Sequence, residues 1–309
     1  MSRGQAGSAT GAAGAAGAAG RGSLVLVATP IGNLGDLSPR AREVLARADL
    51  VCCEDTRRTR ALLSAMGIPA GGPHGDRLLS VHEHNEAARV ERVVACVSSG
   101  GTVAVVTDAG TPGISDPGAL LVQAVVEADG EVSVIPGPTS VVAALVVSGL
   151  PSDRFGVEGF LPRKGAERRE RLASLMRDQR TTVILEAPNR VAATLAELAA
   201  QDPERPVAVV RELTKVHEEV WRGTAGESAS AFAVREVRGE VVLVVGGAPP
   251  AEPVSDEDVE AAVRSWLSRH TGDGPRQIAE LLSAEMGVAR RKVYEAVLRI
   301  RDEVLPPPG

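Results

Sequence analysis

The segment 108–118, with the sequence DAGTPGISDPG, constrains this chain more than any other part of it. It holds three glycines and two prolines in eleven residues, and it lies between the apolar run 103–107 and the apolar, helix-like stretch 119–128. Because glycine and proline favour backbone angles that are uncommon inside helices and strands, the segment predicts a tight loop between a strand and a helix. Open α/β sheets bind their ligands in such loops, at the carboxyl ends of parallel strands. A turn that only reverses the chain is the simpler alternative, but it rarely needs this composition.

Composition limits the partners that this chain can take. With 309 residues it can form two ordinary domains and a small third one. Only 2% of its residues are aromatic and its net charge is −6, which argues against aromatic stacking platforms and against a general electrostatic grip on nucleic acid. Local clusters of basic residues are still compatible with binding to nucleic acid. The sequence shows no secretory signal and no uninterrupted apolar span, and its three cysteines fit neither a disulfide framework nor a metal site. We therefore expect a cytoplasmic protein without membrane or metal.

The chain divides into four parts by pattern. Residues 1–22 are rich in glycine and alanine and predict a disordered tail. In residues 23–150, apolar runs alternate with amphipathic helices, which predicts an α/β domain with a parallel sheet covered on both faces. Residues 151–248 are less regular and predict a second α/β domain with a mixed sheet. Residues 249–309 begin with a proline-rich linker and continue with three helices of helix-turn-helix type.

Four polar or glycine-rich loops follow predicted strands of the first domain: 29–33, 54–56, 108–118 and 136–140. In a parallel sheet they would meet along one edge, which predicts a single small-molecule cleft. The residues that we expect to bind a cofactor there are Pro30, Gly32, Asn33, Asp108, Ala109, Gly110, Thr111, Pro112, Ser115, Asp116, Pro136, Gly137, Pro138 and Ser140.

A nicotinamide-binding fold is one rival interpretation. Glu54 lies about twenty residues beyond Gly32, as the ribose-binding acid does in such folds. The first loop, however, lacks the Gly-x-Gly-x-x-Gly pattern, since Pro30 and Asn33 interrupt it. A Walker lysine motif is also absent, so transfer of a phosphoryl group from ATP is not indicated.

These motifs resemble those of the tetrapyrrole methylase superfamily, the class III S-adenosylmethionine-dependent methyltransferases. Within it, the chain is similar to the ribosomal RNA small subunit methyltransferase I family over about residues 24–247, with the terminal helix-turn-helix that this family carries. Leu185, which precedes Glu186 where an aromatic residue is common, is a small departure. The matching segments are 28–36, 53–57, 82–86, 108–118, 136–138, 149–155, 158–162, 186–190 and 211–215.

The resemblance implies two α/β domains with the methyl donor, S-adenosyl-L-methionine, in the cleft between them. It also implies a homodimer, and an enzyme that methylates the ribose 2′-hydroxyl of a cytidine in the decoding region of 16S ribosomal RNA, on the small ribosomal subunit. A sulfonium donor carries its own activation, so the reaction requires no metal.

Catalysis needs the ribose hydroxyl in line with the methyl group and a nearby base. Our candidates for a base or an orienting group are His84, Glu186 and Lys215, with Asp108 as a further one. A lysine whose pKa is lowered by burial could accept the proton. A structural ion pair is the alternative for each.

RNA binding requires positive charge in spite of the acidic total. Residues 163–180 hold seven basic and three acidic residues, and residues 287–301 hold five basic and one acidic. A solvated amphipathic helix is the alternative for both segments, and Arg190 suits an internal carboxylate as well as a phosphate. The candidates for RNA contact are Arg57, Arg58, Arg163, Lys164, Arg190, Arg290, Arg291 and Lys292.

Three other functions stay open at this point. A methyltransferase of the same fold could act on a precorrin or on diphthamide. A non-catalytic RNA-binding factor could have kept the fold and lost the donor. A regulator could read DNA through residues 290–301. The segment 108–118 and the terminal helices argue against the first, and binding of the methyl donor would argue against the second.

Overall fold

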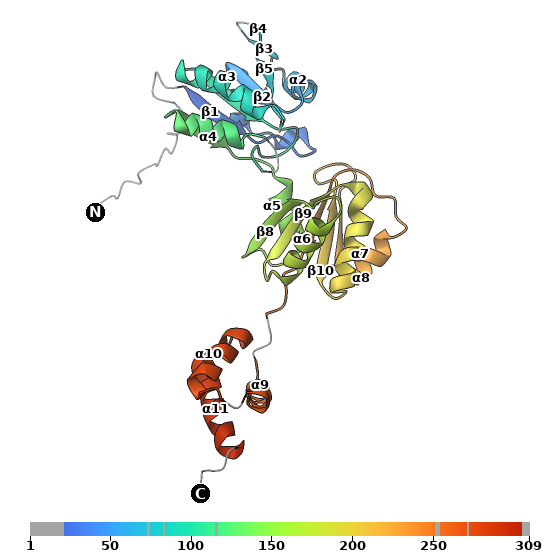
Figure 1. Ribbon diagram of the computed structural model, residues 1–309. Helices are drawn as coiled ribbons and strands as arrows, with labels where there is room; N and C mark the ends of the chain where they lie inside the picture. The colour runs from blue at the N-terminus through green and yellow to red at the C-terminus, as the bar shows by residue number, and fades with distance from the viewer. Residues whose placement is uncertain are drawn as a thin grey trace, which may run out of the picture. The chain divides into compact units, whose positions relative to one another are not determined.

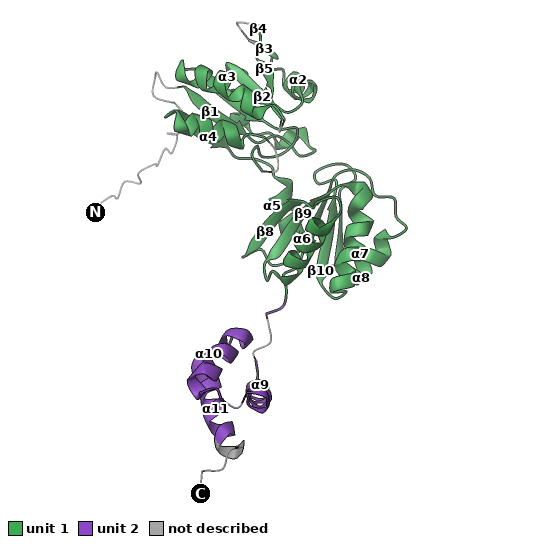
Figure 2. Ribbon diagram, in the orientation of Figure 1, with its two compact units in different colours: residues 1–248 green, residues 249–309 purple. Residues whose placement is uncertain are grey.

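The computed structural model describes residues 22–72, 75–82, 84–114, 117–250, 254–270 and 272–304. The chain forms two compact units, residues 1–248 and residues 249–309 (Figures 1 and 2). The tail predicted for residues 1–22 lies, apart from Gly22, outside the described residues.

The first sheet has five parallel strands in the order β5-β2-β6-β1-β7. Its inner strands β1, β2 and β6 are almost wholly buried and consist of valine, leucine, cysteine and other small residues. Such continuous apolar strands require cover on both faces. The predicted parallel sheet is therefore confirmed. The strands are β1 (Ser23–Val27), β2 (Leu50–Cys53), β5 (Leu78–Ser80), β6 (Thr102–Val106) and β7 (Glu131–Ile135).

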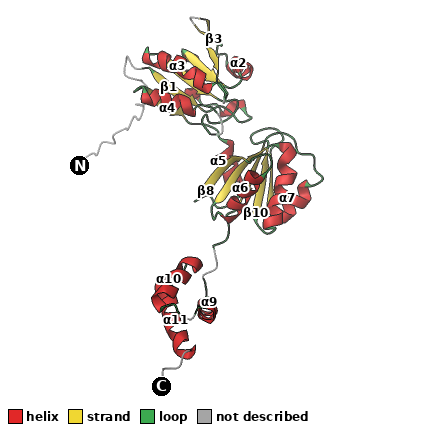
Figure 3. Ribbon diagram, in the orientation of Figure 1, coloured by secondary structure: helices red, strands yellow, loops and turns green. Residues whose placement is uncertain are grey.

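Helices cover this sheet on both faces (Figure 3). The helices α1 (Pro39–Arg47) and α2 (Thr56–Ala65) bury Leu45 and Leu63 against one face. The helices α3 (Glu86–Ser98) and α4 (Ala119–Glu127) bury Val93 and Leu121 against the other. A short pair of strands, β3 (Gly71–Gly72) and β4 (Gly75–Asp76), lies between α2 and β5 in the chain. The N-cap of α2 is Asp55, whose carboxylate accepts from the N–H of Arg57.

The second sheet is mixed, as predicted, in the order β11-β10-β12-β9-β8. Only β8 and β9 run parallel, and the other neighbours are antiparallel. The helices α6 (Ala166–Arg177), α7 (Val191–Gln201) and α8 (Ala225–Phe232) enclose a core around Leu195 and Phe232 on one face. The strands are β8 (Phe155–Phe160), β9 (Thr181–Glu186), β10 (Pro206–Arg211), β11 (Glu219–Thr224) and β12 (Val241–Val245).

Helix α8 was not predicted from the sequence. Its only large apolar residue is Phe232, since the other seven are alanine, glycine, serine and glutamate. A capping box holds its first turn: Thr224 accepts from the N–H of Glu227, whose side chain accepts from the N–H of Thr224. This Thr-x-x-Glu pattern was the available signal.

Helix α5 (Ser140–Ser148) covers the other face of the second sheet, where Ala144 and Leu145 pack with Val183 and Val244. We expected the division between the first two domains after residue 150, which would place α5 with the first sheet. The buried residues of α5 pack on the second sheet instead. The division itself remains a prediction.

The second unit contains the three helices expected near the carboxyl end: α9 (Asp256–Arg269), α10 (Pro275–Met286) and α11 (Arg290–Val304). Val259, Ile278 and Val293 form part of its buried core. Helix α10 ends at Gly287, whose φ of 64° is left-handed, a conformation that glycine adopts without a steric penalty.

Candidate active site

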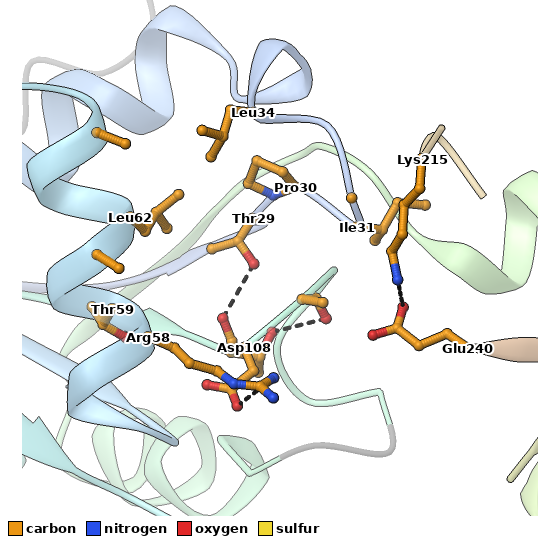
Figure 4. A pocket seen from close by; sticks show the side chains of 15 residues that line it. Thr29, Pro30, Ile31, Leu34, Arg58, Thr59, Leu62, Asp108, Lys215 and Glu240 are labelled. Carbon is orange, nitrogen blue, oxygen red and sulfur yellow. Dashed lines mark hydrogen bonds and ion pairs between the residues drawn. The ribbon is translucent and has the colours of Figure 1, made fainter. Parts of the chain in front are cut away.

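A cavity of about 490 Å³ opens beside the carboxyl ends of strands β1 and β6. Residues of both sheets' loops line it, with Asp108 and Arg58 on one side and Lys215 and Glu240 on the other (Figure 4). Its size lies in the range of roughly 300–1,000 Å³ that is typical of small-molecule sites. The lining residues are Thr29, Pro30, Ile31, Gly32, Leu34, Arg58, Thr59, Ala61, Leu62, Ala65, Thr107, Asp108, Ala109, Lys215 and Glu240.

Hydrogen bonds join the predicted loops at this edge of the sheet. Thr29 and Gly110 form a backbone bridge with N···O distances of 2.9 and 3.1 Å. The Thr111 hydroxyl lies 3.3 Å from the carbonyl oxygen of Pro138, and the N–H of Asp55 lies 3.3 Å from Asp108 Oδ1. The structure therefore brings all four loops together, because the strands that precede them run parallel.

Gly32, one of the residues expected to bind a cofactor, lines the cavity and also lies against the segment 213–215. A Cβ atom at this position would lie 2.5 Å from Lys215 Cγ, 2.7 Å from Thr214 Oγ1 and 2.9 Å from the carbonyl oxygen of Leu213. Glycine is thus needed because the 29–33 loop packs directly on the segment 213–215.

Asp108 is held from two directions. Its Oδ2 lies 3.2 Å from Arg58 Nη1, and its Oδ1 accepts from the N–H of Asp55. The Asp108 side chain is mostly buried, whereas the Arg58 side chain is 68% exposed. The carboxylate is therefore fixed in the cavity wall, while its cationic partner can exchange it for another anion.

Lys215 retains its charge, which contradicts the expectation of a pKa lowered by burial. Its Nζ lies 2.8 Å from Glu212 Oε1 and 3.1 Å from Glu240 Oε2. Partial burial is the largest single influence and acts to lower the pKa of Lys215, but the hydrogen bonds and charges of the two carboxylates together raise the pKa. Lys215 is therefore not suited to accept a proton near neutral pH.

The segment 212–214 that carries Lys215 to the cavity is conformationally restrained. Glu212 and Thr214 have φ values of 53° and 65°, in the left-handed region that residues with a side chain rarely adopt. The hydroxyl of Thr214 is buried and has no hydrogen-bond partner among the described residues. Backbone strain and an unpaired polar atom both occur often at ligand sites.

The structure places Glu186, the second catalytic candidate, apart from the cavity. Its side chain is fully buried and accepts from the Thr194 hydroxyl at 2.6 Å, with Arg190 Nε at 3.1 Å. Arg190 thus has the internal carboxylate that we weighed against an RNA phosphate. His84 is exposed, does not line the cavity, and has His82 as its ring neighbour, with 6.1 Å between centroids.

Of the predicted cofactor-binding residues, Pro30, Gly32, Asp108 and Ala109 line the cavity. Asn33 instead caps the short helix η1 (Leu34–Asp36), accepting from the N–H of Gly35. Gly137 lies against Ala28, where a Cβ would come within 2.9 Å. Ser115 and Asp116 lie outside the described residues. The other predicted residues, which support the loops without lining the cavity, are Gly110, Thr111, Pro112, Pro136, Pro138 and Ser140.

Most of the basic residues predicted to contact RNA pair with carboxylates of this chain. Arg57 pairs with Asp55 and Arg58 with Asp108. In the second unit, Arg290 pairs with Glu280, Arg291 with Glu295 and Lys292 with Asp256. Arg163 and Lys164 differ, because both are exposed and neither has a partner in the part of the chain that the structure describes.

Two groups of functional residues were missed. One face of α2 lines the cavity with Arg58, Leu62 and Ala65, a spacing of four and three residues that a helical reading of the sequence could have found. The two carboxylates on Lys215, from Glu212 and Glu240, were missed as well. Glu240 is 25 residues further along the chain, so no local signal links it to Lys215.

A family model for the tetrapyrrole (corrin/porphyrin) methylases matches residues 23–229. The ribosomal RNA small subunit methyltransferase I of Mycobacterium tuberculosis (strain CDC 1551 / Oshkosh) is 45% identical over 285 residues, 91% of this chain and 96% of that protein. The chain belongs to the ribosomal RNA small subunit methyltransferase I family, within the tetrapyrrole methylases. It is therefore an S-adenosylmethionine-dependent methyltransferase.

Other relatives support the family. The protein of the same name from Synechocystis sp. is 43% identical over 282 residues, 90% of this chain and 98% of that one. Among solved structures, uroporphyrin-III-C-methyltransferase from Thermus thermophilus shares the tetrapyrrole methylase fold, with a TM-score of 0.52 and 24% identity over 73% of this chain and 94% of that one. Diphthine synthase gives a TM-score of 0.52 at 15% identity, over 73% of this chain and 90% of that one. The expected fold class of a tetrapyrrole methylase is confirmed.

Among the described residues, no helix has the length and apolar character needed to cross a membrane. The same residues contain no group of three or more histidine, cysteine or acidic side chains that could hold a metal ion.

Proposed function

We propose that this methyltransferase acts on the ribose 2′-hydroxyl of a cytidine in the decoding region of 16S ribosomal RNA, on the small ribosomal subunit. The observation that carries the proposal is the 45% identity, over nine-tenths of both chains, to a protein named ribosomal RNA small subunit methyltransferase I. The matched region includes the loops that form the cavity.

The cavity residues fit S-adenosylmethionine. The donor has hydroxyl and amino groups that need acceptors, and the mostly buried Asp108 carboxylate is one. The buried, unpaired Thr214 hydroxyl offers a second polar group beside the cavity wall. When bound, the sulfonium supplies an activated methyl group, so the protein needs to orient and not to activate the donor.

Lys215 can contribute by charge. Because its two carboxylate partners keep it protonated, we infer that it stabilises negative charge as it develops on the ribose oxygen. The two carboxylates also hold the Lys215 side chain in one position, whereas an unpaired lysine side chain would take many positions. Asp108 and Lys215 line the same cavity, so donor and acceptor groups could be held on opposite sides of it (Figure 4).

We further propose that the protein works in the cytoplasm, as a homodimer and without a metal. The exposed apolar side chains on α5 and on the edge strand β8 support a subunit interface. These side chains are Val142, Val146, Phe155, Val157 and Phe160. Light scattering of the purified protein tests the dimer, and a monomer at micromolar concentration would contradict it.

The decisive experiment maps 2′-O-methylation along 16S ribosomal RNA from a strain that lacks this protein, before and after the gene is restored. We expect a single cytidine of the decoding region to lose and regain the mark. In vitro, purified 30S subunits should accept a labelled methyl group, whereas a uroporphyrinogen should not. Unchanged methylation in the deletion strain would overturn the proposal, and so would binding of RNA without any binding of S-adenosylhomocysteine in calorimetry.

A further inference from the structure

The loop 161–165 presents two cations that have no partner among the residues that the structure describes. Arg163 and Lys164 lie between β8 and α6, and both are exposed. In the described part of the chain, no carboxylate forms an ion pair with either of them. Their charge is therefore available to an external anion, in contrast to the charges of Arg290, Arg291 and Lys292 on α11.

Two arginines from other elements hold the backbone of this loop. Arg190 Nη2 lies 2.8 Å from the carbonyl oxygen of Leu161, and Arg168 Nη1 lies 3.0 Å from that of Pro162. Arg190 follows β9, and Arg168 lies on α6. Backbone groups outside helices and sheets are satisfied by turns, side chains or water. Here two charged side chains fix the carbonyl groups immediately before the free cations.

A buried polar network holds these two arginines in turn. Arg168 Nη2 donates to Thr194 Oγ1 at 2.8 Å, and this hydroxyl donates to Glu186 Oε2 at 2.6 Å. Glu186 also pairs with Arg190, and Arg168 pairs with Glu197 at 2.8 Å. Thr194 and the Glu186 side chain have no exposed surface. Because buried charges are costly unless fully paired, such a network specifies one geometry.

This network gives the segment 186–190 a role that its sequence did not show. Glu186 does not line the cavity. It holds Arg190 directly and Arg168 through Thr194, and both arginines donate to carbonyl groups of one surface loop. Ion pairs that only stabilised the core would not require hydrogen bonds to the carbonyl groups of an exposed turn. Here both arginines donate to such a turn, and the turn carries two cations.

We propose that the loop 161–165 is a preformed contact for the phosphate backbone of the RNA substrate, with Arg163 and Lys164 as the phosphate-binding side chains. Arg168 and Arg190 are its positioning residues. The inference rests on the proposed function, because it assumes an RNA substrate. Preorganisation lowers the entropy lost when two long side chains bind a phosphate.

The first test compares Arg163→Ala/Lys164→Ala with Arg177→Ala, which removes an exposed cation at the far end of α6 that has no partner among the described residues. The measurement is binding to 30S subunits over a series of salt concentrations. We expect the double variant to bind severalfold more weakly, and the slope of log K against log salt to fall by roughly 0.7 to 0.9 for each cation. The Kd for S-adenosylhomocysteine should not change in either variant.

The second test uses Arg190→Lys, which keeps a positive charge beside Glu186 but shortens the reach to Leu161. We expect KM for the subunit to rise while kcat and the affinity for S-adenosylhomocysteine stay at wild-type values. Arg168→Lys serves as a second variant, and its thermal unfolding shows whether the buried network still folds.

Each idea has its own contradicting result. If the wild-type protein methylates 16S ribosomal RNA but the double variant has the salt slope of Arg177→Ala, the loop is not a phosphate contact and the proposed function stands. If the wild-type protein leaves this RNA unmethylated, the proposed function is wrong, and the proposal for the loop loses the RNA substrate that it assumes. An Arg190→Lys enzyme that loses kcat with unchanged KM would overturn the positioning role.

Discussion

Glu86 closes the amino end of the helix that begins after Gly118. Its Oε1 accepts from the N–H of Gly118 at 2.9 Å, and also from those of Leu120 and Leu121 at 3.0 and 3.3 Å. Gly118, the N-cap of α4, makes no side-chain cap of its own. A carboxylate from α3 therefore satisfies N–H groups that every helix leaves open, and its charge complements the helix dipole. It joins the end of the glycine-rich loop to a second helix of the same domain.

We predict that Glu86→Ala destabilises the protein by about 1–3 kcal/mol, because three N–H groups lose a buried acceptor. Urea unfolding measures the change. Glu91→Ala, an exposed glutamate on the same helix, is the matched control and should alter stability by less than about 0.5 kcal/mol. Equal stability of the two variants would show that the Glu86 contacts contribute nothing.

Gly32→Ala should weaken donor binding. The added Cβ would approach three atoms of the segment 213–215, the nearest at 2.5 Å, so the loop or that segment must move. Overpacking of this kind costs about 1–3 kcal/mol, which is a rise in Kd of roughly 5-fold to 150-fold if the strain falls on the bound form. Calorimetry with S-adenosylhomocysteine measures it. Gly272→Ala, which meets no atom within 4 Å, is the control, and a wild-type Kd for Gly32→Ala would contradict the close contact.

Asp108→Asn keeps the shape of the side chain but removes its charge. We expect the Kd for S-adenosylhomocysteine to rise at least about tenfold, or 1.4 kcal/mol, because the cavity loses its mostly buried carboxylate. Arg58→Gln separates the two partners of the ion pair. If donor binding depends on Asp108 itself, Arg58→Gln should bind the donor almost normally. If both variants lose the same affinity, the ion pair and not the carboxylate is what the donor requires.

Lys215→Met should lower kcat more than it weakens RNA binding, since it removes the fixed positive charge of the cavity.

The free energy of unfolding should also depend on pH in a defined way. The pKa of Lys215 is raised above its ordinary 10.5, so its contribution is complete below that pH and is lost as pH rises through the raised value. The pKa of Glu212 is lowered below 4.5, so its contribution is complete above that pH and is lost as pH falls through the lowered value.

The stability difference between the wild type and Lys215→Met should therefore be largest between these two ordinary pKa values and should shrink at either extreme. Urea unfolding near pH 4, 7 and 11 measures it. Lys164→Met, which removes an exposed lysine with no ion pair in the described part of the chain, is the control and should show no such window. A difference that grows toward high pH would mean that Lys215 is neutral at pH 7 and available as a base.

Local pattern was sufficient for the elements of the first sheet. The apolar strands and the loop at 108–118 follow from periodicity and from glycine and proline placement, and parallel strands bring their loops to one edge. The roles of single charged residues could not be predicted from local pattern. Glu186 ends β9 and Lys215 follows β10, yet Lys215 lines the cavity whereas Glu186 is buried and pairs with Arg190.

The sequence by itself determined the family, the parallel and mixed sheets, and the loop that contributes Asp108 to the cavity, because local motifs and the local placement of apolar, glycine and proline residues indicate each of them. Only the tertiary structure decided which ionisable groups are paired. Lys215 meets Glu240, Glu86 meets Gly118, and Glu186 meets Thr194 through packing of separate elements. The charge state and reach of a side chain depend on such partners, which no local stretch of sequence contains.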